Sequence, residues 1–243
     1  MRQASSLRQP RVASFPPRMR GTLLAHQESD PVRLSIQILA ILIFSAFRLE
    51  AQAVAEGRVQ LPKPGVPAIV NQRYLKLLDA SVITADPPMG VVYLEGVFPP
   101  PASQPQAVMA QRNLAFETSL LPIRAGTLVS FPNEDDVYHN VFSFSKPKRF
   151  DLGRYRKDEL PVPTVLFDKP GPVALHCEIH EHMHAVILVL DTPYFVRTDV
   201  NGSYRLAGLP AGHYLLKAWV DSKTTYERPV DLKAGDVIHA DFP

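Results

Sequence analysis

The stretch from His176 to His184 constrains this chain more than any other, because it gathers the only cysteine and four of the eight histidines. The residues on either side, 173–175 and 185–190, are short apolar runs of Val, Leu, Ile and Ala, which are typical of buried β-strands. A dense group of polar side chains between two such runs is expected to form a loop. We therefore expect this stretch to connect two strands of a β-structure.

The rest of the sequence also favours strands over helices. Proline accounts for 24 of the 243 residues, about twice the usual share of roughly 5%. Val, Thr, Phe and Tyr recur in short runs between Pro and Gly, and the hydrophobic share of 46% is enough for a packed core. The expected fold class is all-β. The predicted strands lie at 57–62, at 90–99, within 121–131 around a turn at Ala125-Gly126, and at 138–144, 165–167, 173–177, 185–190, 198–206 and 208–219.

Four segments interrupt this simple pattern. Residues 71–80 carry apolar side chains at offsets of three and four, which predicts a short helix. Residues 99–105 are rich in proline and are interpreted as a linker. Residues 146–163 are polar and are predicted to be irregular. The dipeptide Asn201-Gly202 between two alternating runs predicts a β-hairpin.

The N-terminal part of the chain indicates export. Residues 34–47 form an uncharged apolar run, followed by the small-residue patterns Ala51-Gln52-Ala53 and Ala53-Val54-Ala55. This arrangement is typical of a secretory signal peptide, which we place at 34–55. The alternative is a membrane anchor, but the run is shorter than the ~20 residues of a spanning helix, so we expect no stable membrane span after cleavage. Residues 1–33 are expected to be a disordered leader, and the protein to be periplasmic or otherwise extracytoplasmic.

Export changes the interpretation of the net charge of the chain and of its single cysteine. Seven of the 26 Lys and Arg residues, but only three of the 24 Asp and Glu residues, lie in the first 53 positions. The remaining chain is slightly acidic and shows no basic patch for nucleic acid. An extracytoplasmic compartment favours disulfides, yet Cys177 has no second cysteine in this chain to pair with. Intermolecular pairing and metal binding remain as reasons for this thiol.

Metal binding suits the residues that follow Cys177. His180 and Met183 come three and six positions later, and a thiolate, an imidazole and a thioether are ligands that select copper. A blue-copper site needs two imidazoles and one thiolate in a near-trigonal plane, with a weak axial ligand such as methionine. The second imidazole has to come from elsewhere. His139 lies 38 residues upstream, on a predicted strand that follows a polar loop.

These pieces together resemble the cupredoxin family of blue, type 1 copper proteins. The resemblance covers about residues 107–191, and the ligand spacing is similar to that of amicyanin. The order of the motifs is also similar to exported plastocyanin-like proteins known as methylamine utilisation proteins. The resemblance implies a Greek-key β-sandwich. The motifs that carry it are Phe131-Pro132-Asn133, His139-Asn140-Val141, Phe167-Asp168-Lys169-Pro170-Gly171 and Cys177-x-x-His180-x-x-Met183.

The resemblance also implies a ligand set and a function. His139, Cys177 and His180 become the equatorial ligands of one mononuclear type 1 copper, and Met183 becomes the axial ligand. Asn140 is implied to form hydrogen bonds that stiffen the ligand loop. The implied function is one-electron transfer rather than catalysis. His180, on an exposed loop, is the expected exit for the electron to a redox partner protein, a cytochrome or a dehydrogenase.

Each of these residues also has a simpler interpretation. A lone cysteine is most often a small buried hydrophobe, a methionine is most often part of a core, and a histidine beside a strand is most often only hydrogen-bonded. Their combination in register is what favours a copper site. For His176, His182 and His184, solvated or hydrogen-bonded side chains are the simpler expectation. A second metal site or a role in copper uptake is the alternative.

Two positions argue against a catalytic copper cluster. A second copper of the nitrite reductase type needs a histidine five positions after His139, where Phe144 stands. The multicopper pattern needs a histidine where Glu178 stands. Two rivals to electron transfer remain: a periplasmic copper carrier or buffer, and a type 1 copper subunit of a partner oxidoreductase.

The segments on either side of 107–191 resemble a second module, the carboxypeptidase regulatory-like (transthyretin-like) β-sandwich. Residues 193–243 contain its Asp-x-Asn-Gly-x-Tyr and Leu-Pro-Ala-Gly-x-Tyr patterns, and residues 57–97 resemble its opening strands. Fifty-one residues are few for an independent sandwich. Our hypothesis is that the copper domain is inserted into a smaller, split β-sandwich made of 57–97 and 193–243.

Overall fold

A computed structural model of the protein describes residues 52–63 and 88–243. These ranges contain seventeen strands and no helix, which confirms the prediction of an all-β fold. The helix predicted at 71–80, the leader at 1–33 and all but the last four residues of the predicted signal peptide lie outside the described residues. Nothing in the described ranges forms a helix with the length and apolar character needed to cross a membrane.

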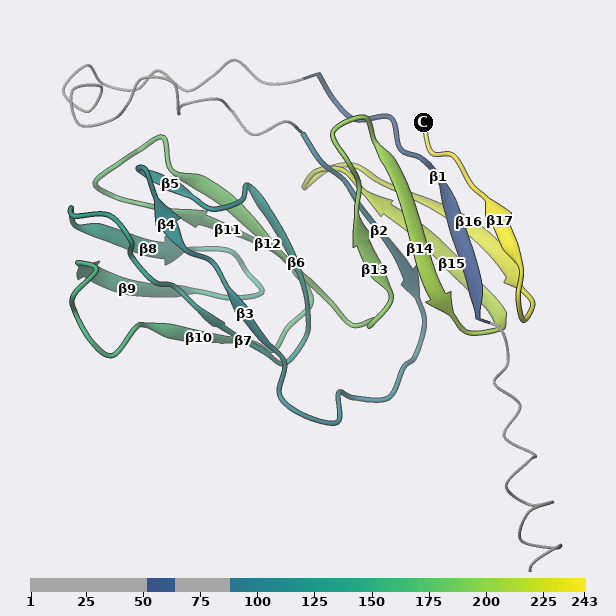
Figure 1. Ribbon diagram of the computed structural model, residues 1–243, viewed down its shortest axis with the longest axis horizontal. Helices are drawn as coiled ribbons and strands as arrows, with labels where there is room; N and C mark the ends of the chain where they lie inside the picture. Colours follow the sequence, from purple (N-terminus) through teal and green to yellow (C-terminus); the bar gives the residue numbers. More distant parts are fainter. Residues whose placement is uncertain (1–51, 64–87) are drawn as a thin grey trace, which may run out of the picture. The chain divides into compact units, whose positions relative to one another are not determined.

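Strands β3 to β12 form the first of two β-sandwiches (Figure 1). One sheet has the order β6-β12-β11-β8-β9 and the other the order β10-β7-β3, while β4 and β5 form a separate two-stranded hairpin. Apolar side chains of both sheets, such as Val129, Phe167, Leu175 and Ile187, build its core. The bounds are β3 (Gln106–Val108), β4 (Gln111–Arg112), β5 (Ala115–Phe116), β6 (Leu120–Arg124), β7 (Thr127–Ser130), β8 (His139–Ser143), β9 (Phe150–Tyr155), β10 (Thr164–Phe167), β11 (Gly171–His176) and β12 (His184–Leu190).

The turn at Ala125-Gly126 carries the chain from one of these sheets to the other. Strand β6 pairs in parallel with β12, whereas β7 pairs antiparallel with β10 and in parallel with β3. Gly126 has a φ of +90°, a conformation that residues with a Cβ atom rarely adopt. The two strands predicted around this turn are therefore present, and they belong to different sheets.

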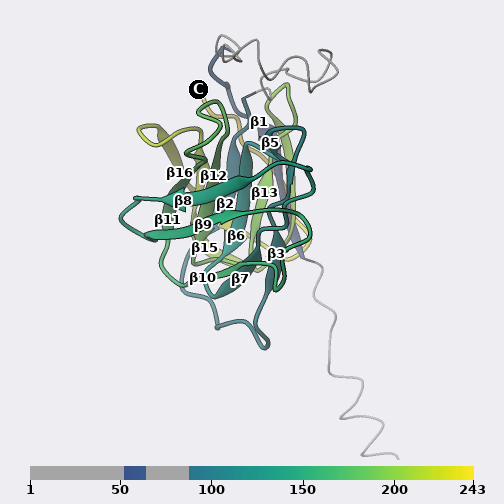
Figure 2. The same ribbon diagram turned by 90° about the vertical axis from the view of Figure 1, so that its left-hand side faces the viewer.

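The segment 146–163, predicted to be irregular, contains strand β9. This strand pairs antiparallel with β8 at the edge of the five-stranded sheet (Figure 2). Within β9 only Tyr155 is buried, while Asp151, Gly153 and Arg154 are exposed. The prediction was wrong because an edge strand receives its hydrogen bonds from one neighbour and needs little apolar alternation in its own sequence.

Strands that precede and follow the first sandwich build the second one together. Its sheets have the orders β14-β1-β17 and β13-β2-β15-β16, and Figure 1 shows β1 between β14 and β17. Its core is apolar and includes Leu94, Leu209, Leu216 and Leu232. The bounds are β1 (Ala53–Arg58), β2 (Val91–Glu95), β13 (Phe195–Arg197), β14 (Ser203–Leu209), β15 (Gly212–Trp219), β16 (Thr225–Leu232) and β17 (Val237–His239).

Strand β1 begins at Ala53, earlier than the strand predicted at 57–62 and inside the predicted signal peptide. Ala53 and Ala55 are fully buried in the second core. Ala55 and Glu56 pair with β14 on one side and with β17 on the other. The small alanines were interpreted only as a cleavage signal, so their role as closely packed strand residues was missed.

The turn at Asn201-Gly202 is present, but the predicted hairpin is not. The preceding strand β13 pairs with β2, and the following strand β14 pairs with β1, so the turn crosses between sheets. Gly202 has a φ of +80°, and a Cβ atom at this position would lie 2.0 Å from the carbonyl oxygen of Val59. The glycine is therefore required both by its backbone conformation and by the close approach of the chain after β1.

Candidate metal centre

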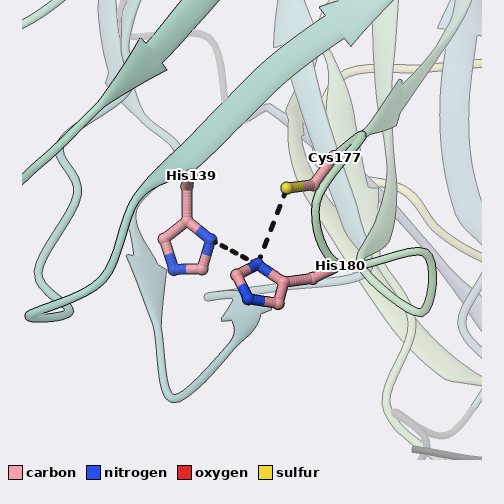
Figure 3. Close-up of side chains that lie close together, drawn as sticks. All are labelled: His139, Cys177 and His180. Carbon is pink, nitrogen blue, oxygen red and sulfur yellow. Dashed lines mark hydrogen bonds between the residues drawn. The ribbon is translucent and has the colours of Figure 1, made fainter. Parts of the chain in front are cut away.

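Three predicted ligands meet in the first sandwich. His139 is the first residue of β8, Cys177 follows the last residue of β11, and His180 lies in the loop between β11 and β12. Figure 3 shows the three side chains pointing toward one another. All three are buried, with exposed fractions of 0% for His139, 4% for Cys177 and 3% for His180. Two segments far apart in the sequence thus bring their donor atoms into one enclosed place.

The donor atoms have the spacing of ligands that share one ion. The Nδ1 atoms of His139 and His180 lie 3.0 Å apart, and the Sγ atom of Cys177 lies 3.8 Å from Nδ1 of His180 (Figure 3). All three donors lie within 4.8 Å of one another. In a trigonal site with metal–nitrogen bonds of about 2.0 Å and a metal–sulfur bond of about 2.3 Å, these separations are about 3.5 and 3.7 Å. The residues therefore fit a copper ion held by two imidazoles and a thiolate.

The environment of Cys177 favours the thiolate that binds metal. Burial by itself raises the pKa of this thiol, but the neighbouring side chains of His139 and His180 and hydrogen bonds from the backbone N–H groups of Asn140 and His180 lower it. The result is a pKa of about 5, down from an ordinary value of 9.0. A deprotonated cysteine is the form that acts as a ligand, so the site is electrostatically prepared for a cation.

A carboxylate that the sequence analysis missed orients His139. The Nε2–H group of His139 donates to Oδ2 of Asp135 at 2.8 Å, which leaves Nδ1 as the unprotonated atom facing His180 and Cys177. Burial lowers the pKa of His139, but Asp135 and Cys177 raise it more, so the net shift is upward. Such carboxylate–imidazole pairs fix the tautomer and ring position of metal ligands. Asp135 stands four residues before His139 in an acidic triplet, but spacing alone does not single it out.

A strained hairpin turn holds Asp135 in place. The two residues between β4 and β5, Asn113 and Leu114, have φ angles of +54° and +55°, as in a type I′ turn. Their N–H groups donate to the Asp135 carboxylate at 2.7 and 2.9 Å. The carbonyl oxygen of Leu114 accepts a hydrogen bond from Nε2 of His182 at 3.0 Å. The same turn therefore contacts both the carboxylate behind His139 and the loop that carries His180.

The side chain of Asn140 does not do what the resemblance implied. Its Nδ2 group donates to Oδ1 of Asp151 at 2.7 Å and to the carbonyl oxygen of Gly153 at 3.2 Å. Both partners lie on β9, so the side chain fastens β8 to the edge strand rather than to the ligand loop. The contribution of Asn140 to the site comes from its backbone N–H group, which donates to Cys177.

The remaining loop residues are placed as follows. Met183 is 1% exposed and belongs to the same core cluster as Cys177, and its N–H group donates to the carbonyl oxygen of His180 at 2.9 Å. The loop that carries His180, the expected exit for the electron, is exposed at Glu178 and Glu181, but the side chain of His180 itself is buried. The ring of His182 lies edge-on to it, with centroids 6.1 Å apart. Loop position alone does not predict this burial.

The two residues that argued against a catalytic cluster lie at the surface. The side chain of Phe144 is 74% exposed. Glu178 forms an ion pair with Arg154 across the sheet edge, at 2.7 Å. His176 and His184 lie opposite each other on β11 and β12, and they take no part in the buried cluster.

No protein-family model and no curated protein matches this sequence. Among solved structures, the chain is similar to the Cu-containing nitrite reductase (NirK) from Thermus scotoductus SA-01, with 26% identity and a TM-score of 0.33 over 35% of this chain and 22% of that chain. A variant of amicyanin in its reduced Cu(I) form shows 18% identity and a TM-score of 0.33 over 41% of this chain and 98% of that chain.

A purple cupredoxin from Nitrosopumilus maritimus shows 21% identity and a TM-score of 0.30 over 35% of this chain and 99% of that chain. Of the nitrite reductase chain, by contrast, this chain spans only about a fifth. TM-scores of this size carry no weight for function. The proposal that follows therefore stands on the motifs and on the geometry of the buried cluster.

Proposed function

We propose that residues 107–191 form a cupredoxin-type domain that binds one mononuclear type 1 copper, and that the protein acts in one-electron transfer. In this proposal His139, Cys177 and His180 are the equatorial ligands and Met183 is the axial ligand. The observation that carries it is the meeting of two imidazole Nδ1 atoms and one thiolate within 4.8 Å in a buried place. Nothing in an ordinary apolar core requires that combination.

The chain's own contribution is to hold these donor atoms ready. Asp135 keeps His139 in the tautomer that presents Nδ1, and backbone N–H groups stabilise the Cys177 thiolate. Burial of His180 excludes water from the cluster. Copper bound there supplies the Cu(II)/Cu(I) couple. Because the ligands are fixed by neighbouring residues, the chain has little to rearrange when the charge changes.

The test is to add Cu(II) to the chain and record the absorption spectrum and the electron paramagnetic resonance spectrum. We expect an intense blue thiolate-to-copper band whose intensity saturates at one Cu(II) per buried cluster. Cys177→Ser should abolish the band, whereas His182→Gln, which alters a neighbouring histidine outside the ligand set, should retain it. A wild-type chain that binds no copper and stays colourless would overturn the proposal.

Export and a partner are part of the same proposal. We propose that the chain is exported by the signal peptide at 34–55 and exchanges electrons with a cytochrome or a dehydrogenase. The burial of Ala55 in strand β1 supports cleavage after Ala53, two residues before the predicted end of the signal peptide, because cleavage after Ala55 also removes that buried residue. N-terminal sequencing of the exported protein tests this. An intact N-terminus on the exported chain would contradict it.

The second sandwich is proposed to be the split regulatory-like module, which binds or orients a partner and has no chemistry of its own. The pairing of β1 and β2 with strands that follow residue 192 supports the split.

A copper carrier or buffer is the second candidate function. The two extra histidines beside Cys177 and Met183, His176 and His184, favour it. The rate of copper loss separates the two functions: a carrier should release copper quickly on reduction, whereas an electron carrier should keep it through repeated redox cycles.

A further inference from the structure

Two histidines outside the buried cluster face each other across neighbouring strands. His176 ends β11 and His184 begins β12, and the two residues are direct partners in the antiparallel ladder. Their Nδ1 atoms lie 3.0 Å apart, and their ring centroids lie 5.1 Å apart. Directly opposite residues have Cβ atoms about 4.5–5.5 Å apart, so a cross-strand pair of imidazoles can point both nitrogens at one place.

Strand alternation puts this pair on the outer face of the five-stranded sheet. Leu175 and Ala185, the neighbours of the two histidines, are buried in the core, so His176 and His184 point the other way. His184 is exposed and His176 is half-buried. The pair is therefore open to solvent, in contrast to the enclosed cluster around Cys177.

The position of the pair is fixed by its surroundings. The register of β11 and β12 continues through five further residue pairs. On the other side of His176, Phe142 is its partner on β8, and the two rings pack with centroids 5.6 Å apart. Phe144 lies against Phe142 in turn, at 5.3 Å. Packing of this kind limits the rotamers of His176 and so reduces the ordering that binding an ion would demand.

We propose that His176 and His184 form a second, surface metal site for a divalent transition-metal ion such as Zn(II), Ni(II) or Cu(II). A hydrogen bond joins the two Nδ1 atoms across 3.0 Å, and an ion about 2.0–2.1 Å from each nitrogen takes the place of its proton, which is released to water. Imidazole suits these metals, and water completes the coordination. The site is distinct from the buried cluster and does not depend on the proposed copper function.

The test is a Zn(II) titration of the full chain by isothermal titration calorimetry, with the protein metal-free and its thiol reduced. Thiolate and imidazole both bind zinc, so we expect two ions per chain, one at each place. His184→Gln should remove one of them and Cys177→Ala the other. His213→Gln and His239→Gln are matched controls, because each of those exposed histidines faces a single carboxylate, and both should keep two.

The outcomes separate the two sites. An unchanged number of zinc ions in His184→Gln would overturn the surface site, whatever happens at Cys177. An unchanged number in Cys177→Ala, with a loss in His184→Gln, would leave the surface site standing and contradict the buried one. Ring-nitrogen NMR of the wild-type chain gives a second measurement that needs no variant. Zinc should shift the Nδ1 signals of His176 and His184, and unshifted signals at saturation would count against the proposal.

Discussion

The two β-sandwiches differ in how many polar side chains they bury. Each has a core of apolar side chains from two sheets, but seven of the nine buried polar residues in the described ranges lie within 107–191. Burying a polar group costs free energy unless it is hydrogen-bonded. The first sandwich therefore has to supply hydrogen-bond partners for many more buried polar side chains than the second. The seven are Gln111, Thr127, Asn133, His139, Asn140, Ser143 and His180.

Backbone strain follows the same division. In the part of the chain that is described, the two non-glycine residues with a positive φ are Asn113 and Leu114, and both belong to the first sandwich. A left-handed conformation is costly for a branched residue such as leucine. The turn persists because its N–H groups bind Asp135 and its carbonyl group binds His182. Strain that is tied to a polar cluster is expected at a functional site, and none accompanies the second core.

Copper should sharpen this contrast by stabilising only the first sandwich. A ligand at a thousand times its dissociation constant raises the free energy of unfolding by about 4 kcal/mol. We expect a rise of about that size on adding Cu(II), measured by denaturant titration. Cys177→Ser, which keeps the surface pair His176 and His184, serves as the control and should show a much smaller rise. An equal rise in that variant would mean that copper acts elsewhere on the chain.

Matched core truncations test whether packing in the two sandwiches is separable from the site. Leu175 and Leu216 are both fully buried, one in each core. Leucine-to-alanine changes at such positions cost about 2–5 kcal/mol, so Leu175→Ala and Leu216→Ala should destabilise the fold alike in chemical unfolding. Only Leu175→Ala, two residues from Cys177, should also weaken copper binding. Equal loss of copper binding in both variants would contradict the division of roles.

The contrast also explains which predictions succeeded. Residues whose chemistry is rare, such as Cys177 and the histidines at 139 and 180, stood out in the sequence, and the structure brings them together. Periodic apolar runs located most strands, including β8 and β12. The strand β9 was missed because its extended conformation depends on hydrogen bonds to β8 and not on an alternation of apolar residues in its own sequence.

Other features lay beyond what the sequence can indicate. The pairing of β13 and β14 with different partners depends on long-range sheet contacts, which a local Asn-Gly signal does not encode. The role of Asp135 depends on a fold that brings residues 113–114 against residue 135. The burial of His180 depends on how its loop folds back against the rest of the sandwich. Each of these is a tertiary effect that overrides local preference.

Asp135 offers a smaller and more local test. Replacing a carboxylate that supports a metal-bound histidine typically costs ten- to a hundredfold in metal affinity. We expect Asp135→Asn to lower copper affinity by about that factor while the blue band stays in place, because the three donors remain. Asp136→Asn is the matched control, since that neighbouring carboxylate faces Lys157 rather than a histidine. Equal affinity in the two variants would show that His139 needs no carboxylate.

Two buried tyrosines give the smallest expected difference between the sandwiches. The hydroxyl of Tyr204 donates to the carbonyl oxygen of Ala240 at 2.6 Å in the second core. That of Tyr155 donates to the carbonyl oxygen of Phe131 at 2.8 Å and also accepts from Nε2 of Gln111 at 2.5 Å.

Burial raises the pKa of Tyr155 to about 12 and raises that of Tyr204 as well, so both hydroxyls stay protonated at neutral pH. Losing one buried hydrogen bond costs about 1 kcal/mol, and leaving a second polar group short of a partner adds to it. Tyr204→Phe should therefore cost about 1 kcal/mol and Tyr155→Phe about 2 kcal/mol in denaturant unfolding. Gln111 explains the difference, because its buried Nε2 group would lose its shortest hydrogen bond and keep only the carbonyl oxygens of Phe131 and Pro132, each at 3.4 Å. An equal loss of unfolding free energy in the two variants would show that the hydrogen bonds around Tyr155 contribute no more to stability than the single hydrogen bond of Tyr204.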